Sequence, residues 1–332
     1  MRVFALCLLS ALTAWPQFRS TVPLVVAPTT ITDRKGRMVD GLDTSCLVLY
    51  DNNVVRPIQS DVSMYPISLV VAVDAGEDSQ AILGKLGNSG ILFSQLMAAD
   101  QGETALIAFG DKVTELVDFT SNPDDLTHVL KRIRTQGGGA AVLDGLSTAL
   151  TMLSHRQPGR RRIVLMISES RDRSSDAKLP EVVLQAQRLN AAIYWLTYST
   201  TFSRYTDRKV KTIGDIEDPS QKGIDKKRDA TPVPADTPDM SLLAPFIALA
   251  HLTSPNLANL FTRLTGTPSL NFLTKSGLED AIHAIGEEVH RQYILTFEPA
   301  PGAAGLFHTI RVEVKNRPDL KAKTREGYWA VE

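Results

Sequence analysis

The pattern of apolar and polar positions changes character twice along the chain. Residues 20–65 contain short apolar runs separated by turns rich in Asn, Asp and Gly, which is typical of antiparallel strands. Residues 66–291 contain longer apolar runs that alternate with stretches of helical periodicity. In residues 292–332 a strand pattern returns, because Ile310 and Val312 alternate with polar positions. We therefore expect two β segments on either side of an α/β domain.

The central segment predicts a doubly wound, mostly parallel sheet. Four of its runs are apolar on both faces: ISLVVAV, TALIAFG, RIVLMIS and AAIYWLTYS. Strands of this kind lie in parallel sheets that helices cover on both sides. Two of the helical stretches begin with capping signals, Asn122 followed by Pro123 and Ser276 followed by Glu279. The order strand, helix, strand, helix favours an α/β fold.

Two β segments that flank an α/β domain predict one small β-sandwich, built from both ends of the chain, with the α/β domain inserted in it. Residues 203–240 break the α/β pattern, since they are highly charged, contain four prolines and have almost no apolar clusters. Such a composition predicts a mobile surface insertion. A segment that becomes ordered on contact with a partner is the alternative interpretation.

The first residues have the pattern of a secretory signal. Arg2 precedes an apolar run, residues 3–14, that ends in the small residue Ala14. We expect residues 1–14 to be a signal peptide and the protein to be secreted or periplasmic; an ordinary buried strand or helix start is the alternative. Removal of this segment would leave Cys46 as the sole cysteine, so the sequence predicts neither a disulfide framework nor a cysteine-rich metal site.

The composition of the chain argues against two classes of protein, nucleic-acid binders and membrane-spanning proteins. The formal net charge is −1, with 36 basic and 37 acidic residues, which argues against nucleic acid as a partner. No apolar run reaches the roughly 18 residues that a membrane span requires. The hydrophobic content of 43% over 332 residues is enough for a sizeable core. We therefore expect a globular protein that neither binds nucleic acid nor spans a membrane.

Candidate chemistry lies at three points near strand ends. The stretch DAGED starts at Asp74, GGGAAVLDG at Gly137 and SESRD at Ser168. In an open parallel sheet, ligands bind beyond the carboxyl ends of the strands, so we expect these three loops to lie together. None of the three contains a histidine, and a hydrolase would need a base there. The sequence therefore favours a binding site over an active site, with a metal-assisted hydrolase as the weaker alternative.

Four blocks, in this order and spacing, resemble a von Willebrand factor A-type (VWFA) domain: PISLVVAVDAGEDS, GETALIAFGDKVTELVDFTSNPDDLTHVLKRI, GGGAAVLDGLSTAL and RRIVLMISESRD. The flanks ITDRKGRMVDGL and FHTIRVEVKNRPDLKAKTREGYWA are similar to the secreted VWFA-related proteins abundant in acidobacteria. The resemblance covers residues 20–332 apart from the insertion. It implies a Rossmann-like fold and a module that binds a partner, often through a metal-ion-dependent adhesion site (MIDAS).

In that family the adhesion site has Asp-x-Ser-x-Ser on the first loop, a threonine on the second and an aspartate on the third. The resemblance places Asp74 at the first aspartate, Gly76 and Asp78 at the serines, Ala140 at the threonine and Glu169 at the third-loop aspartate. Gly76 and Ala140 carry no side-chain oxygen, whereas Mg²⁺ takes about six oxygen ligands in an octahedron. The resemblance therefore implies a degenerate MIDAS.

Two interpretations of the acidic residues remain open. In the first, no metal binds, Asp74 caps a loop or helix end, and Asp78 begins a helix, where negative charge is favourable. In the second, Asp74, Asp78 and Glu169 form a carboxylate-rich site that suits Ca²⁺ or Mn²⁺ better than Mg²⁺. We adopt the first hypothesis: we expect no cofactor, and a weakly bound divalent cation is the alternative.

The predicted function is that of a secreted, non-enzymatic, adhesion-type module that binds a protein partner without Mg²⁺. Arg171, Asp172 and Arg173 follow the third of these strands and would replace metal-mediated capture by direct ion pairs with the partner. A structural or envelope-assembly protein that has lost ligand binding is a further alternative.

Overall fold

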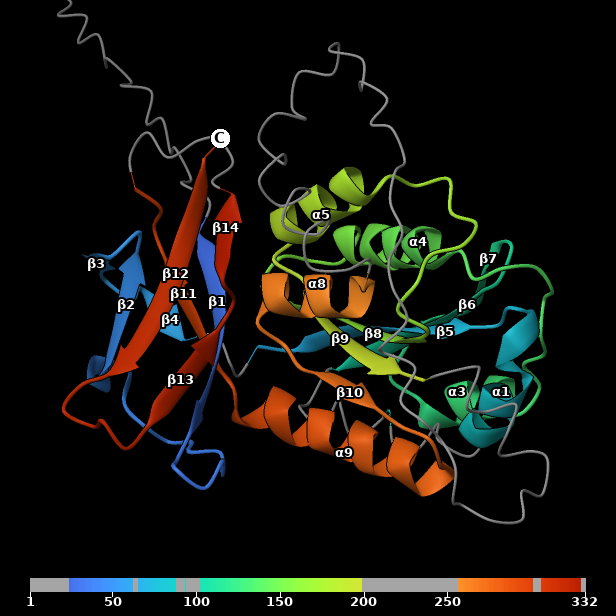
Figure 1. Ribbon diagram of the computed structural model, residues 1–332, viewed down its shortest axis with the longest axis horizontal. Coiled ribbons are helices and arrows are strands. Elements are labelled where there is room, and N and C mark those ends of the chain that lie inside the picture. Colours follow the sequence, from blue (N-terminus) through green and yellow to red (C-terminus); the bar gives the residue numbers. More distant parts are fainter. Residues whose placement is uncertain are drawn as a thin grey trace, which may run out of the picture.

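The part of the chain that the structure describes forms three β-sheets and two layers of helices (Figure 1). The computed structural model describes residues 24–61, 65–87, 93, 102–198, 256–300 and 306–329. The predicted signal peptide, 1–14, and the predicted insertion, 203–240, lie outside these residues. Within them, no helix combines the length and the apolar character needed to cross a membrane.

The central sheet has six strands in the order β10-β9-β8-β5-β6-β7. Their bounds are β5 (Ile67–Asp74), β6 (Glu103–Phe109), β7 (Val113–Thr120), β8 (Arg161–Ser168), β9 (Ala192–Thr197) and β10 (Ser269–Asn271). All neighbours are parallel except β6 and β7, which are antiparallel. In the middle of the sheet, Val70 of β5 lies between Ala105 of β6 and Val164 of β8. The predicted α/β fold with a mostly parallel sheet is confirmed.

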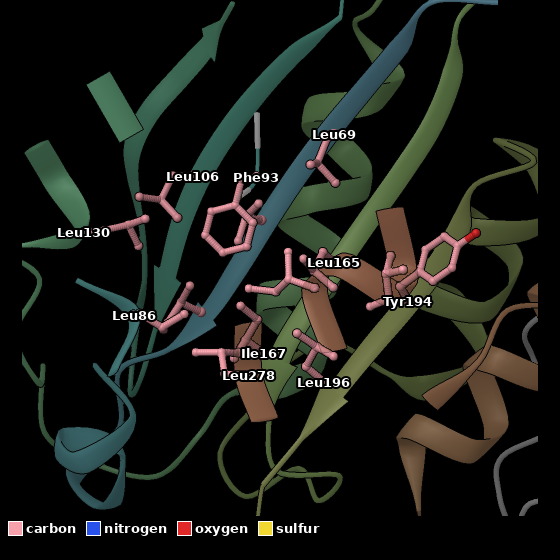
Figure 2. Close-up of a cluster of buried hydrophobic side chains, with 14 of the residues drawn as sticks. Leu69, Leu86, Phe93, Leu106, Leu130, Leu165, Ile167, Tyr194, Leu196 and Leu278 are labelled. Atoms are coloured by element: carbon pink, nitrogen blue, oxygen red, sulfur yellow. The ribbon is translucent and has the colours of Figure 1, made fainter. Parts of the chain in front are cut away.

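Helices cover both faces of this sheet, as the apolar strands require. On one face lie α1 (Gln80–Leu86), α3 (Pro123–Leu130) and α9 (Lys275–Arg291), whose apolar residues pack against Leu69, Val71 and Val73 of β5. Figure 2 shows part of this core. On the other face lie α4 (Val142–Ser154), α5 (Leu179–Arg188) and α8 (Leu257–Thr265), which pack against Val70 and Ala72. Alternate residues of one strand therefore enter different cores.

Two four-stranded sheets stand beside the α/β part, at the left of Figure 1. One has the order β13-β1-β11-β4, with β1 (Val25–Thr32), β4 (Ser60–Asp61), β11 (Tyr293–Phe297) and β13 (Lys321–Thr324). The other has the order β14-β12-β2-β3, with β2 (Leu47–Asp51), which follows the 3₁₀ helix η1 (Thr44–Cys46), β3 (Val54–Arg56), β12 (Phe307–Val314) and β14 (Gly327–Trp329). Both sheets join strands from the two ends of the chain, since β1 pairs with β11 and β2 with β12. They share a third core.

The α/β part and the terminal sheets contact each other through buried polar groups. The guanidinium of Arg325, before β14, donates to the carbonyls of Gly327 and Val26 at 2.9 and 3.0 Å and also bonds Gln187 of α5. Burial lowers the pKa of Arg325 to about 10. Thr30 of β1 donates to Glu288 of α9 at 2.9 Å. These hydrogen bonds join elements that are far apart in sequence.

The structure shows whether the two predicted capping residues, Asn122 and Ser276, begin their helices. Asn122 caps α3, because its side chain accepts a hydrogen bond from the Asp124 amide at 3.1 Å. The start predicted at Ser276 is wrong: α9 begins at Lys275, and the cap is Thr274, which accepts from the Gly277 amide at 3.0 Å. Both residues are hydroxyl-bearing and two positions apart, so the sequence identified the helix but not its first turn.

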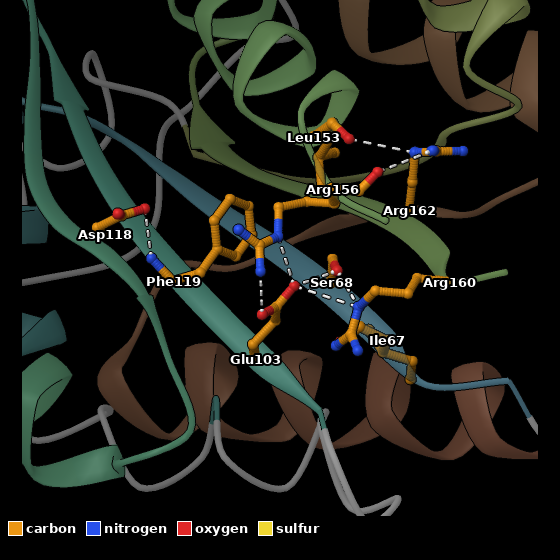
Figure 3. Close-up of polar contacts among 9 residues, drawn as sticks. All are labelled: Ile67, Ser68, Glu103, Asp118, Phe119, Leu153, Arg156, Arg160 and Arg162. Carbon is orange, nitrogen blue, oxygen red and sulfur yellow. Dashed lines mark hydrogen bonds and ion pairs between the residues drawn. The ribbon is translucent and has the colours of Figure 1, made fainter. Parts of the chain in front are cut away.

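The amino-terminal edge of the central sheet is held by a cluster around Glu103, the first residue of β6 (Figure 3). Arg156 donates to both carboxylate oxygens of Glu103, at 2.8 and 2.7 Å. Arg160 lies 3.2 Å from the same carboxylate, and Ser68 of β5 donates to it at 2.6 Å. One acid thus connects the starts of two strands and the segment between α4 and β8.

Candidate functional site

Asp74 stands at the carboxyl end of β5, in the middle of the central sheet. It is only 4% exposed, because β6 and β8 flank the strand on both sides. Its Oδ1 accepts a hydrogen bond from the Gly76 amide at 2.8 Å. Burial raises the pKa of Asp74, and the Gly76 amide opposes this shift. The fold therefore holds a carboxylate where it is poorly solvated.

Gly76 allows the chain to turn tightly around that carboxylate. A Cβ at this position would lie 3.1 Å from Asp74 Oδ1 and 3.3 Å from the carbonyl oxygen of Gly138. A serine here would require its neighbours to shift by a few tenths of an ångström. The next residue, Glu77, donates its amide to Gly138 at 3.1 Å, which joins the first loop to the second. Close backbone contact thus replaces a side-chain oxygen at this position.

Ala140, on the second loop, faces the hydrophobic core. It is 6% exposed and belongs to the cluster of apolar residues that α4 forms with the sheet. Its backbone carbonyl accepts a hydrogen bond from the Arg173 amide at 3.1 Å. Ala140 therefore positions the third loop through its backbone and supplies no side-chain ligand.

Arg173 joins the first loop to the third. Its Nη1 lies 3.2 Å from Oδ2 of Asp78, and its Nη2 lies 2.6 Å from Oε2 of Glu169. Asp78 belongs to the 3₁₀ helix η2 (Glu77–Ser79), directly before α1, so it does stand at the start of a helix. The carboxylate of Glu169 is the main cause of the raised pKa of Arg173. Two of the three candidate metal-binding carboxylates are thus paired with a cation of the chain itself.

The other two candidates for ion pairing have different surroundings. Asp172 accepts hydrogen bonds from the Leu143 amide at 3.1 Å and from the Ser175 hydroxyl at 2.5 Å. Because Leu143 lies in the first turn of α4, and Ala141 before the helix offers no capping side chain, Asp172 acts as a cap from a distant loop. Arg171 is exposed and makes no hydrogen bond or ion pair with any residue that the structure describes.

Tyr198, directly after β9, is a site residue that the sequence analysis missed. It is 7% exposed and packs edge-on against Phe272. Its hydroxyl is buried and has no partner at regular hydrogen-bond distance and angle within the described chain. Burial raises its pKa, and the nearby Asp74 raises it further. Nothing in the apolar run AAIYWLTYS distinguishes this tyrosine from a core residue; only its position at the strand end does.

The side chains present do not fit a Mg²⁺ ion. Two of the positions that the resemblance assigns to ligands, Gly76 and Ala140, have no side-chain oxygen, and Asp78 and Glu169 are paired with Arg173. Among the described residues, no group of three or more His, Cys, Asp and Glu side chains is close enough to hold a metal ion. Mg²⁺ requires near-ideal octahedral oxygen geometry, which this donor set lacks.

Comparison with known proteins identifies one family. The family model described as von Willebrand factor type A domain matches residues 72–171, from β5 to the loop after β8. No curated protein matches the chain. Similar solved structures include an aerotolerance-related membrane protein from Bacteroides fragilis, with 12% identity over 67% of this chain and 99% of that chain and a TM-score of 0.40.

Two further solved structures are similar. The conserved hypothetical protein BatB from Bacteroides thetaiotaomicron has 14% identity over 67% of this chain and 97% of its own, with a TM-score of 0.41. A von Willebrand factor type A protein from Catenulispora acidiphila has 9% identity over 94% of this chain and 64% of its own, with a TM-score of 0.46.

Proposed function

Because the chain contains a von Willebrand factor type A domain, we propose that it is a non-enzymatic protein-interaction module that binds its partner without Mg²⁺. Domains of this family mediate protein interaction. The proposed contact surface is the set of loops at the carboxyl edge of the central sheet, residues 74–79, 137–141 and 168–172. Ligands of open α/β sheets bind at this edge.

The proposal that no metal ion is needed depends on one observation: too few side-chain oxygens are available at the expected ligand positions. At Gly76 there is no room for a side chain without movement of Asp74 or Gly138, and Ala140 points into the core. A metal ion in this family's adhesion site attracts an acidic group of the partner. With too few oxygen ligands for such an ion, the partner must be held by the protein's own side chains and backbone.

Arg171 is the cation that we propose for direct contact with the partner. Arg173 pairs within the chain and Asp172 caps α4, whereas Arg171 is exposed. A guanidinium binds a carboxylate through two parallel hydrogen bonds, so it suits capture of an acidic side chain. Secretion or a periplasmic location is part of the proposal, and it rests on the apolar run of residues 3–14.

A pull-down from envelope extract tests the proposal. The immobilised chain is incubated with extract in three buffers, which contain EDTA, Mg²⁺ or neither. We expect the same partner to be retained in all three, and Arg171→Gln to retain less of it. Lys321→Gln is the matched control, because Lys321 is an exposed cation on β13, outside the loop surface. Loss of the partner in EDTA would contradict the proposal.

The carboxylate-rich alternative makes a different prediction for the isolated chain. If Asp74, Asp78 and Glu169 bind Ca²⁺ or Mn²⁺, calorimetric titration gives a binding signal that Asp74→Ala removes. We expect no such signal with Mg²⁺, Mn²⁺ or Ca²⁺. A clear signal that depends on Asp74 would replace the metal-free proposal with the carboxylate-rich site.

A further inference from the structure

We infer that Arg173 is a built-in counter-cation, which joins the loops of the binding edge as a bound metal ion would, and that this edge therefore exists in one permanent, ion-independent state. The inference concerns the loop surface of the proposed function and rests on that proposal only for its biological meaning. The pairing itself is a property of the isolated chain.

The guanidinium of Arg173 lies between the first and the third loop. Its two terminal nitrogens reach different loops, with Nη1 3.2 Å from Asp78 after β5 and Nη2 2.6 Å from Glu169 after β8. These two carboxylates are 91 positions apart in the chain, and Glu169 is four positions from Arg173. A cation between two acids removes their mutual repulsion and makes charge-assisted hydrogen bonds with both.

The backbone of Arg173 is also hydrogen-bonded to the second loop. Its amide donates to the carbonyl of Ala140 at 3.1 Å, and the hydroxyl of the following Ser174 donates to the carbonyl of Gly139 at 3.1 Å. A Cβ on Gly139 would lie 3.1 Å from the Cβ of Arg173, so glycine allows this close approach. One residue therefore contacts all three loops.

Covalent attachment is the difference from a metal ion. A bound ion can leave, so a metal-dependent surface has an empty and an occupied state whose populations follow the free ion concentration. Arg173 keeps its charge at every physiological pH and cannot be removed by a chelator. The loop edge is consequently arranged before any partner arrives, and changes in divalent cation concentration do not regulate it.

Hydrogen exchange on the full chain tests this inference without a partner. We expect peptides that cover 74–79, 137–141 and 169–173 to exchange at the same rate in EDTA and in Mg²⁺ or Ca²⁺. Arg173→Gln should exchange about three to ten times faster in all three peptides, because two ion pairs of intermediate exposure are lost. Arg171→Gln, two positions away on the same loop, is the matched control and should leave the rates unchanged.

A charge exchange separates an electrostatic role from simple packing. Glu169→Arg combined with Arg173→Glu restores the opposite charges with their positions reversed, and we expect it to recover part of the protection that Arg173→Glu alone removes. The inference is wrong if Arg173→Gln behaves like Arg171→Gln, or if divalent cations slow exchange in the unmodified chain. Neither outcome depends on finding the partner, so a failed pull-down and a failed inference are distinguishable.

Discussion

Each edge of the central sheet has one charged side chain between two side chains of opposite charge, but the signs of the charges are reversed between the two edges. At the amino-terminal edge, one acid, Glu103, lies between two arginines, Arg156 and Arg160. At the carboxyl edge, one arginine, Arg173, lies between two acids, Asp78 and Glu169. Each central group satisfies partners from separate elements. The edges differ in exposure: the side chain of Glu103 is 15% exposed and that of Arg173 is 45% exposed.

This difference in exposure is the one expected between a structural cluster and the proposed binding surface. Glu103 is a strand residue, and its partners lie on a neighbouring strand and on the segment from α4 to β8. Arg173 lies on a loop, and so does each residue that it contacts through a hydrogen bond, apart from Asp78 in the short helix η2. Loops on a rigid scaffold are where proteins place binding groups. We therefore expect the amino-terminal edge to contribute mainly to stability, and the carboxyl edge to make the proposed contact with the partner.

Glu103→Gln is expected to have the largest effect on stability. It leaves the guanidiniums of Arg156 and Arg160 without the carboxylate, and we expect the free energy of unfolding to fall by about 2–3 kcal/mol. Urea denaturation measures this change. Glu115→Gln on β7 is the control, because Glu115 is exposed and has no contact of this kind with the residues that the structure describes. Equal effects of the two substitutions would remove the structural role of Glu103.

Double-mutant cycles compare the two edges directly. For the pair Arg156 and Glu103 we expect a coupling energy of about 1–2 kcal/mol, because the contact is bidentate and partly buried. For Arg173 and Glu169 we expect about 0.5–1 kcal/mol, since the more exposed guanidinium is better screened. In 1 M salt the Debye length is about 3 Å. When unfolding is repeated at this concentration, the coupling energy of Arg173 and Glu169 should fall more steeply than that of Arg156 and Glu103. The reverse ranking would undo the comparison.

Asp74→Asn distinguishes the edges by the sign of its effect. Because burial raises the pKa of Asp74 in the fold, its favourable contribution is complete below about pH 4, the pKa of an unfolded aspartate, and is lost as pH rises through the higher folded pKa. Asparagine keeps an oxygen for the Gly76 amide and carries no charge. We therefore expect the variant to be more stable at pH 7, by about 1 kcal/mol, with a smaller gain at pH 4.

The measurement is the thermal unfolding midpoint of both proteins at several pH values between 4 and 7.5. A gain that grows with pH would show that the carboxyl edge keeps this acid at a cost to stability, as binding sites do. A loss at every pH would make Asp74 a structural residue like Glu103.

Arg171→Gln should change stability least. Arg171 is exposed and makes no hydrogen bond or ion pair in the described chain, so we expect a change of less than about 0.5 kcal/mol in the free energy of unfolding. Retention of the partner in the pull-down should nevertheless decrease, because that contact is made only in the complex. A stability loss as large as the one expected for Glu103→Gln would mean that Arg171 has an internal partner after all.

Most of the sheet was predictable because its strands are buried on both faces. The runs around Val70, Val164 and Ile193 need helices on each side, and this requirement leaves few alternatives to an α/β fold. The antiparallel edge strand β7 is not among the four apolar runs predicted as strands, since its residues are exposed or half-exposed and its apolar pattern is weak. Helix starts were identified less accurately than helices, as Thr274 and Ser276 show, because either hydroxyl can cap a first turn.

The sequence by itself determined which residues of the site have a side-chain oxygen that could bind a metal ion. Gly76 and Ala140 have none in any fold. The three-dimensional path of the loops determined the roles of three adjacent residues that the sequence could not tell apart. Arg173 reaches Asp78, 95 positions earlier, Asp172 reaches the start of α4, and Arg171 faces solvent. The physical reason is range. The hydrophobic periodicity of a strand or helix can be seen in neighbouring positions of the sequence, whereas an ion pair between loops depends on distances that exist only after the sheet has brought their ends together.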